Sequence, residues 1–509
     1  MTMSEAPVPG RRIVWNSLLN ALGQGAPAIV AVFAVPLLVR GLGVERFGIL
    51  TLAWAVVGYF SLFDFGLGRA LTQVVAERRA SGDEAGINAV VVACLAAMLG
   101  LGIAALGIAE AVSPWLIRDV LAVTPPLRSE ALLAFRILAA GIPVVVLTAG
   151  LRGALEAYER FDLVNAIRAP VGMTSYLGPL VLLPFTHRLT AVVGVIVLAR
   201  AISLAAHYVS YREVIGPFRR TSMTADGAFP LVLRAGGWMT VSSLISPMMV
   251  YADRFVVGGL LSAGAVAFYT APYEMVSRLM IVAGAVSSTL FPAFAGNGTK
   301  RHTADLFARG LMMTCLVLFP VTLAVILFAR EGMSLWLGAE FARRSAGVLQ
   351  LLAVGVFVNC LAQIAFTLVQ GVGRADLSAR LHLAEVPFYI VLVWSLVSSR
   401  GLIGAALAWT LRVSIDAAGM FWLAARVAPE ARDRRFARIW IFNAGALSVL
   451  CVSLAVSTMS LGVRALALAL ATPVAIGGGW RWVASGEERR QLTLMVSRVG
   501  IRFRTAEDL

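Results

Sequence analysis

The chain has 509 residues, of which 59% are hydrophobic and only 14% are charged, and its formal net charge at pH 7 is +15. A soluble protein carries about 25% charged residues, so this composition excludes a water-soluble globular fold. The positive charge lies mainly in loop arginines, which membrane topology explains, so we expect no nucleic-acid partner.

Apolar runs of roughly 20 residues recur along the whole chain, and this is the length that a helix needs to cross a bilayer. The pattern predicts an all-α polytopic membrane protein with about 14 transmembrane helices. The expected spans are roughly 13–39, 47–75, 87–112, 131–152, 166–185, 189–211, 230–254, 264–292, 307–329, 346–370, 378–398, 401–425, 438–459 and 463–483.

The first expected helix is apolar except for Asn16, Asn20 and Gln24. Their four-residue spacing puts the three amides on one helical face. Amides that faced lipid would lack hydrogen-bond partners, so we expect this face to contact protein or a water-filled cavity. Pro27 and Pro36 interrupt the same helix, which favours a moving or cavity-lining role.

The connecting segments distribute their basic residues unevenly. With the N-terminus inside, lysines and arginines gather on the side that holds both chain ends, which predicts that both termini are cytoplasmic.

The second half of the chain begins much like the first, because Arg11 and Trp15 recur as Arg234 and Trp238. Two six-helix halves related as parallel repeats are a common transporter plan, with the substrate site between them. The expected domains are an N-terminal six-helix bundle at 1–211, a cytoplasmic linker at 212–229, a C-terminal six-helix bundle at 230–426, and helices 13 and 14 with a basic cytoplasmic tail at 427–509.

Two stretches of the chain carry recognisable motifs. The first holds Asn16, Pro36-Leu37-Leu38-Val39-Arg40, Leu42-Gly43-Val44-Glu45-Arg46-Phe47-Gly48, Asp64-Phe65-Gly66-Leu67 and Ala70. The second holds Asp253-Arg254-Phe255, Gly258, Leu261-Ser262, Ala267-Phe268-Tyr269 and Leu290-Phe291-Pro292. With these motifs the chain resembles the polysaccharide flippases of the MOP superfamily. It lacks the early Arg-Asp pair of the lipid II flippase branch, so a peptidoglycan precursor is not the expected substrate.

The resemblance implies two six-helix bundles in a pseudo-twofold V, two extra C-terminal helices, and a cavity lined by helices one, two, seven and eight. The chain contains no GxSxG, HExxH or P-loop motif, so no enzymatic activity is expected. Its implied function is to move an undecaprenyl-pyrophosphate-linked oligosaccharide of an O-antigen or exopolysaccharide across the bacterial inner membrane by alternating access. The implied partners are this oligosaccharide, membrane lipids and polysaccharide polymerase machinery. No cofactor is expected besides a coupling proton or sodium ion.

Arg200, Arg278 and Arg412 fall near the middle of expected spans, where an arginine is costly unless it is paired or solvated. A guanidinium group donates two parallel hydrogen bonds to phosphate, so these arginines are candidate pyrophosphate ligands. Arg278 is the preferred candidate, because the resemblance places helix eight on the cavity. Tyr273 shares roughly the same face and is a polar cavity candidate with the three amides of the first helix.

Each arginine also has a structural interpretation. Arg412 and Asp416 are one helical turn apart and would neutralise each other, and Glu274 and Arg278 have the same spacing. Arg200 would donate to backbone carbonyls between outer helices.

Asp64 and Asp253 are candidates for a gate or for ion coupling, because a carboxylate in a dry site can carry a proton. Each lies near the end of an expected span with an arginine nearby, Arg69 or Arg254, so a helix cap or a gate salt bridge is the favoured interpretation. The cysteines and histidines show no metal-ligand spacing, so no metal site is expected.

Two other functions compete with the flippase. A cation-coupled multidrug exporter of the same superfamily would need acidic groups in its cavity, whereas arginines outnumber carboxylates near mid-span. A polytopic O-antigen ligase or glycosyltransferase would need long outside loops, and the longest one expected here runs from about Ser113 to Glu130.

Overall fold

A computed structural model describes residues 26–27, 29–60, 67–218, 249, 251–295, 300–429, 434–479 and 481 of the chain. These residues form α-helices and one short π-helix, and none of them lies in a β-strand. The expectation of an all-α membrane protein is therefore confirmed. In the described residues, eight helices are long and apolar enough to cross a membrane, or nine if the pair α10–α11 counts as one span. The expected count of fourteen is compatible with this number.

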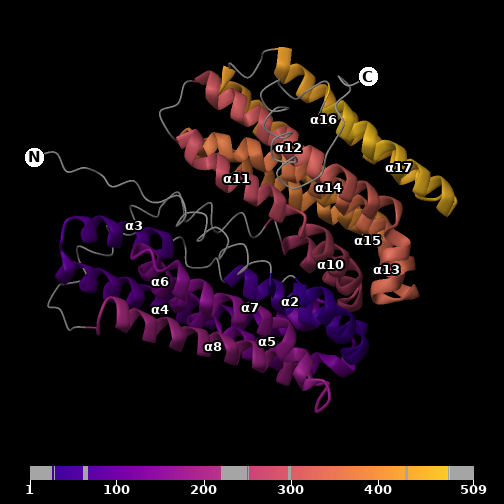
Figure 1. Cartoon of the computed structure of the whole chain (residues 1–509). Helices are drawn as coiled ribbons and strands as arrows, with labels where there is room; N and C mark the ends of the chain where they lie inside the picture. The colour runs from indigo at the N-terminus through magenta and orange to yellow at the C-terminus, as the bar shows by residue number, and fades with distance from the viewer. Residues whose placement is uncertain are drawn as a thin grey trace, which may run out of the picture. The chain divides into compact units, whose positions relative to one another are not determined.

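The first half of the chain contains the helices drawn from indigo to magenta in Figure 1. After an apolar helix at Ile29–Leu42 come α2 (Val44–Phe60), α3 (Leu67–Ala80), α4 (Glu84–Trp115), the π-helix η1 (Leu116–Val120), α5 (Pro125–Ala140), α6 (Ile142–Ala157), α7 (Phe161–Leu182) and α8 (Leu189–Val214).

The second half continues with a helical stretch at 251–260. It is followed by α10 (Ala263–Ser277), α11 (Met280–Ala295), α12 (Lys300–Leu327), α13 (Ala329–Leu337), α14 (Ala339–Gly371), α15 (Ala375–Val427), α16 (Arg434–Val456) and α17 (Leu461–Gly478).

Two expectations about connections can be compared with these helices. The predicted division between spans eleven and twelve is confirmed: the 53-residue α15 breaks at Gly401, whose φ of 59° and ψ of −135° are not helical. The predicted loop from Ser113 to Glu130 is wrong, because α4 continues into η1 and α5 begins at Pro125. A proline at the first helical position has a suitable φ and needs no amide partner, so it starts a helix readily.

The chain folds into two compact units that interleave along the sequence. The first unit comprises residues 1–275, 335–348 and 379–409, and the second comprises 276–334, 349–378 and 410–509.

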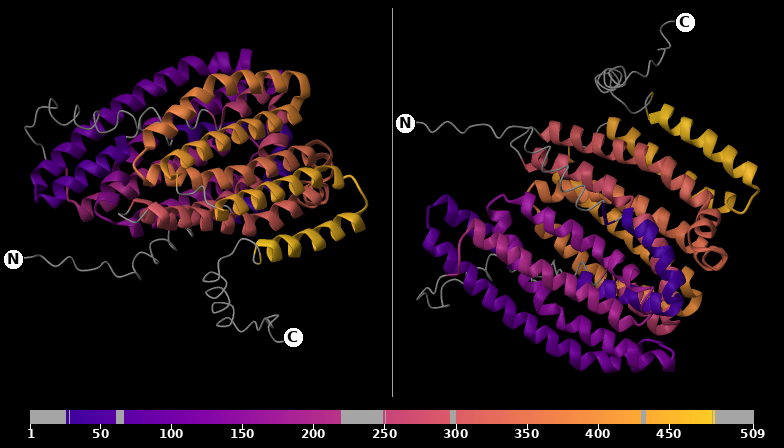
Figure 2. Two further views of the ribbon diagram at one scale, coloured as in Figure 1. Left: turned by 90° about the horizontal axis from the view of Figure 1, so that it is seen from above. Right: turned by 60° about the horizontal axis from the view of Figure 1, so that its bottom comes forward.

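Small residues bring the helices of the first unit close together. A Cβ atom on Gly153 of α6 would stand 2.4 Å from the Gly68 carbonyl oxygen of α3. Thr72 donates to this carbonyl and also to that of Gly153, each at 3.0 Å. Gly102 of α4 approaches Pro143 of α6 in the same way. In a membrane, where burial of apolar surface does not drive helix association, such close contacts stabilise a bundle. Figures 1 and 2 show α3, α4 and α6 side by side.

The motif from Leu42 to Gly48 has a structural role in the first unit. The Glu45 carboxylate accepts a hydrogen bond from the Thr124 amide at 2.9 Å, and Arg46 pairs with Glu130 at 3.1 Å. Gly48 lies against the backbone of Ala263, where an added Cβ would be 1.9 Å from the carbonyl oxygen. The motif therefore joins the start of α2 to the first turns of α5 and to the first residue of α10.

The two C-terminal helices of the second unit pack on α12, as the right view in Figure 2 shows. Arg464 near the start of α17 is buried and donates to the Leu327 carbonyl at 2.9 Å and to Glu331 at 2.7 Å. The hydrogen bonds from Arg464 lower the pKa of the Glu331 carboxyl below its ordinary value. This pair ties α17 to the junction of α12 and α13.

We expect Gly48→Ala to destabilise the protein, because the new methyl group would overlap the Ala263 carbonyl and force the two backbones apart. Overpacking of this kind costs about 1–3 kcal/mol, so the melting temperature should fall by several degrees. Gly100→Ala in α4 is the matched control, since nothing lies within 4 Å of its Cβ position. Equal melting temperatures of the two purified variants would contradict the close contact at Gly48.

Candidate functional site

A cluster of charged and aromatic residues, buried or half-buried, lies between the helical stretch 251–260 and the part of α10 up to Met275, both within the first unit. We call it the arginine–tyrosine cluster. Its members are Tyr251, Asp253, Arg254, Tyr269, Tyr273 and Glu274.

Arg254 lies at the centre of the cluster with 3% of its surface exposed. Its guanidinium pairs with the Glu274 carboxylate at 3.3 Å. The rings of Tyr251 and Tyr273 lie 5.0 and 5.1 Å from the guanidinium carbon, which is cation–π range. Its Nε is buried without a hydrogen-bond partner. A buried arginine needs an ion pair and ring contacts of this kind, because desolvation of its charge is costly.

Asp253 is fully buried and has different partners from Arg254. One carboxylate oxygen accepts from the Arg254 amide at 2.7 Å, and the other accepts a short hydrogen bond from the Tyr269 hydroxyl. Tyr269 and Tyr273 are four residues apart, so α10 presents both toward the same stretch. The salt bridge that the structure shows here joins Arg254 to Glu274, and the role of Asp253 in a gate or in ion coupling stays a prediction.

The cluster is anchored to segments that are distant in the sequence. The Tyr273 ring meets Trp409 edge to face, with centroids 5.5 Å apart. Elsewhere on α10, the backbone carbonyl of Phe268 accepts a hydrogen bond from the Ser345 hydroxyl at 2.8 Å. Residues from three separate stretches of the first unit thus hold α10 in place.

Arg278 occupies a break between two helices. The chain leaves α10 at Ser277 and enters α11 at Met280, so Arg278 and Leu279 form a turn, closed by a hydrogen bond from the Leu279 amide to the Val276 carbonyl at 3.0 Å. Arg278 is half-buried. Broken helices inside a membrane expose backbone groups that can bind a polar ligand, and the role of Arg278 in binding stays a prediction.

The other two candidate arginines lie far from this break in the sequence. Arg200 is half-buried on α8, and its Nε has no hydrogen-bond partner. Arg412 and Asp416 are both buried on successive turns of α15, as the proposed structural pair requires.

Four candidates lie outside the described residues, namely Asn16, Asn20, Gln24 and Asp64. Their roles stay predictions. In the part of the chain that is described, no three His, Cys, Asp or Glu side chains are grouped as a metal site would require.

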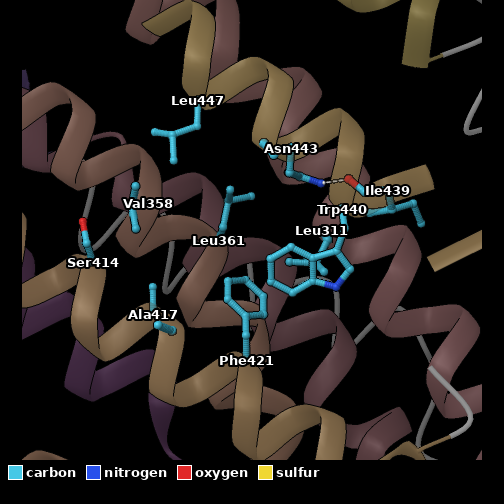
Figure 3. Close-up of a pocket in the computed structure, with 12 residues that line it drawn as sticks. Leu311, Val358, Leu361, Ser414, Ala417, Phe421, Ile439, Trp440, Asn443 and Leu447 are labelled. Carbon is cyan, nitrogen blue, oxygen red and sulfur yellow. Dashed lines mark hydrogen bonds between the residues drawn. The ribbon is translucent and has the colours of Figure 1, made fainter. Parts of the chain in front are cut away.

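The second unit contains an apolar pocket of about 360 Å³ between α12, α14, α15 and α16, shown in Figure 3. Phe421 and Trp440 form one wall, with ring centroids 4.5 Å apart. Asn443 also lines the pocket, and its amide nitrogen donates to the Ile439 carbonyl of its own helix at 2.7 Å. The remaining lining residues are Leu311, Val358, Leu361, Ser414, Ala417, Ala418, Ile439, Ala444 and Leu447. Such a surface suits a hydrocarbon chain and not a sugar or a phosphate.

Sequence reasoning missed the central position of Arg254, because its place near the end of an expected span suggested a loop arginine. One signal was available: Tyr251 precedes Arg254 by three residues, and Tyr269 and Tyr273 repeat at helical spacing. The contacts of Glu45 and Glu130 had no such local signal, because their partners are far away in the sequence.

Comparisons with known proteins agree with this architecture. The family model described as "Polysaccharide biosynthesis protein" matches residues 13–298. A Shigella flexneri protein named "Putative O-antigen transporter" is 32% identical over 425 residues, which cover 82% of this chain and 98% of that protein.

Two solved structures share the fold. The lipid II flippase MurJ in an inward closed conformation gives a TM-score of 0.71 at 14% identity, with 91% of this chain and 99% of that chain covered. An inward-facing MATE-family multidrug resistance transporter gives 0.67 at 18% identity, with 82% and 99% covered. The relatives are transporters and not enzymes. Together with the helical fold, the family match shows that the chain belongs to the polysaccharide biosynthesis protein family, the polysaccharide flippases of the MOP superfamily.

Proposed function

We propose that this protein moves an undecaprenyl-pyrophosphate-linked oligosaccharide, an O-antigen or exopolysaccharide unit, from the cytoplasmic to the outer leaflet of the bacterial inner membrane. Both chain ends are cytoplasmic in this proposal, as the distribution of basic residues favours. The observation that carries it is the similarity to a "Putative O-antigen transporter" over 98% of that protein's length.

The charges of the helices support a pyrophosphate as the part of the cargo that is bound inside the membrane. Arg278 lies in the turn between the end of α10 and the start of α11, so its guanidinium group is next to two helix ends in the sequence. An arginine guanidinium group can donate two parallel hydrogen bonds to phosphate oxygens, and this contact is stronger where water is scarce. Arg200 and Arg412 are further candidates, and the amides of Asn16, Asn20 and Gln24 would bind sugar hydroxyls.

We propose that the halves alternate between two conformations, with Asp253 coupling this change to a proton or sodium gradient. Asp253 is fully buried, and a carboxylate in a dry site can carry a proton. Uptake at Asp253 would compete with the hydrogen bond from Tyr269 and so alter the packing of α10.

Flipping in proteoliposomes tests the proposed function. The purified protein would be reconstituted with fluorescent undecaprenyl-pyrophosphate oligosaccharide, and the accessibility of the headgroup followed with and without an ion gradient. Protein-dependent movement supports the flippase. Efflux of a cationic dye without movement of the lipid would favour the multidrug exporter. A strain that lacks the protein provides a further test. If single lipid-linked repeat units accumulate on the cytoplasmic side of its membrane, the protein is a flippase and not a ligase.

Arg278→Ala should reduce flipping by tenfold or more, because a charge-assisted contact to phosphate is worth about 1.5–3 kcal/mol. Membrane insertion should be unchanged. Arg188→Ala is the control, since this exposed arginine precedes α8 at a helix end. Wild-type flipping by Arg278→Ala, measured at equal protein incorporation, would remove Arg278 from the binding site.

Asp253→Asn should abolish the stimulation of flipping by the coupling gradient, because an amide cannot take up and release the cation. Downhill flipping without a gradient should persist. Asp119→Asn, at an exposed carboxylate in η1, is the matched control. If the ratio of rates with and without the gradient is the same in Asp253→Asn as in the wild type, Asp253 is not the coupling residue.

A further inference from the structure

The part of α14 that belongs to the second unit is buried on all sides except along one narrow stripe. Among the candidate spans of the described chain, α14 has the largest buried share, 83% of its most apolar stretch. Between residues 352 and 369, every residue is buried except Asn359, Gln363 and Phe366, and Gln370 is the next half-exposed position. Their intervals of four, three and four residues define one helical face. We call Asn359, Gln363 and Gln370 the α14 amide stripe.

The amides of the stripe differ from other polar side chains of the same helix, which are bonded to backbone. Gln350 of α14 donates to the Ile326 carbonyl of α12 at 3.0 Å, and so joins two helices. Thr367 is buried and donates to a backbone carbonyl of its own helix at 2.7 Å. In the described part of the chain, the amide groups of Gln363 and Gln370 form no such bond. The stripe therefore does not serve to hold helices together.

The stripe begins next to the helix break that contains Arg278. Asn359 Nδ2 lies 3.8 Å from the sulfur of Met280, the first residue of α11, and a thioether sulfur is only a weak acceptor. At the other end of the stripe, a Cβ atom on Gly371 would stand 2.6 Å from the Phe294 Cβ. Helix α11 therefore lies beside α14 along the length of the stripe, with Arg278 two residues before its start.

Half-exposed amides within an apolar span need a polar environment, because amides that faced lipid would lack hydrogen-bond partners. An amide group offers two donor hydrogens and an acceptor oxygen, and it carries no charge. A sugar hydroxyl is likewise both a donor and an acceptor. A phosphate offers acceptors only, and an organic cation would find no counter-charge on the stripe. The chemistry of the stripe therefore fits the hydroxyl groups of a carbohydrate.

We propose that the α14 amide stripe binds the sugars of the lipid-linked oligosaccharide. This inference rests on the proposed function and assigns the two parts of the cargo to different residues of the second unit, the pyrophosphate to Arg278 and the sugars to the stripe. From Asn359 to Gln370 the stripe extends about 16 Å at the helical rise of about 1.5 Å per residue. This length suits a short chain of sugars better than a single one.

Binding of two lipids to the purified full-length protein in phosphatidylcholine nanodiscs tests the proposal. The probes are undecaprenyl pyrophosphate without sugar and the fluorescent undecaprenyl-pyrophosphate oligosaccharide, and bound lipid is counted by native mass spectrometry. The double variant Gln363→Met and Gln370→Met removes two amides with little change in size or helix propensity. It should weaken binding of the oligosaccharide probe by about tenfold and leave binding of the sugar-free probe unchanged.

Gln350→Met is the matched control, because it removes an amide of the same helix that is bonded to the Ile326 carbonyl. This variant should have a lower melting temperature than the wild type and bind both probes equally well. The double variant should keep the wild-type melting temperature, because its amides take part in no hydrogen bond within the described chain. The single variants Gln363→Met and Gln370→Met are compared in the same way, and each should lose part of the oligosaccharide binding.

The outcomes separate the sugar site from the proposed function. If the wild type binds the oligosaccharide probe and the stripe variants bind it as tightly, or lose both probes to the same extent, the sugar site is wrong and the proposed function stands. A lower melting temperature of the stripe variants with unchanged binding would show that the amides are structural. If the wild type binds neither probe, the proposed function fails and the sugar site fails with it.

Discussion

The lack of hydrogen-bond partners in the bilayer is the constraint on which the rest of this structure depends. Backbone groups must be satisfied within the chain, so the described residues form helices, and buried polar side chains must find partners nearby. Thr72 donates to carbonyls of two helices, and Asp253 accepts from a backbone amide and a tyrosine hydroxyl.

The arginine–tyrosine cluster shows how this constraint produces a candidate coupling element. Arg254 is stabilised by Glu274 and by two aromatic rings, while Asp253 is held by Tyr269. All of these contacts converge on α10, which ends one residue before Arg278. A change of charge at Asp253 would therefore act on the same helix that leads to the candidate phosphate ligand.

The sequence by itself determined the helical membrane fold, the division of the 375–427 region into two spans, the family, and the arginines near mid-span. It could do so because hydropathy, short motifs and intramembrane charge are local properties of the chain. Only the tertiary structure decided that Glu274 pairs with Arg254, that Gly48 lies against Ala263, and that Ser345 donates to the Phe268 carbonyl. These contacts depend on the rotation and register of neighbouring helices, which helical periodicity does not specify, because it gives the face of a residue and not its partner.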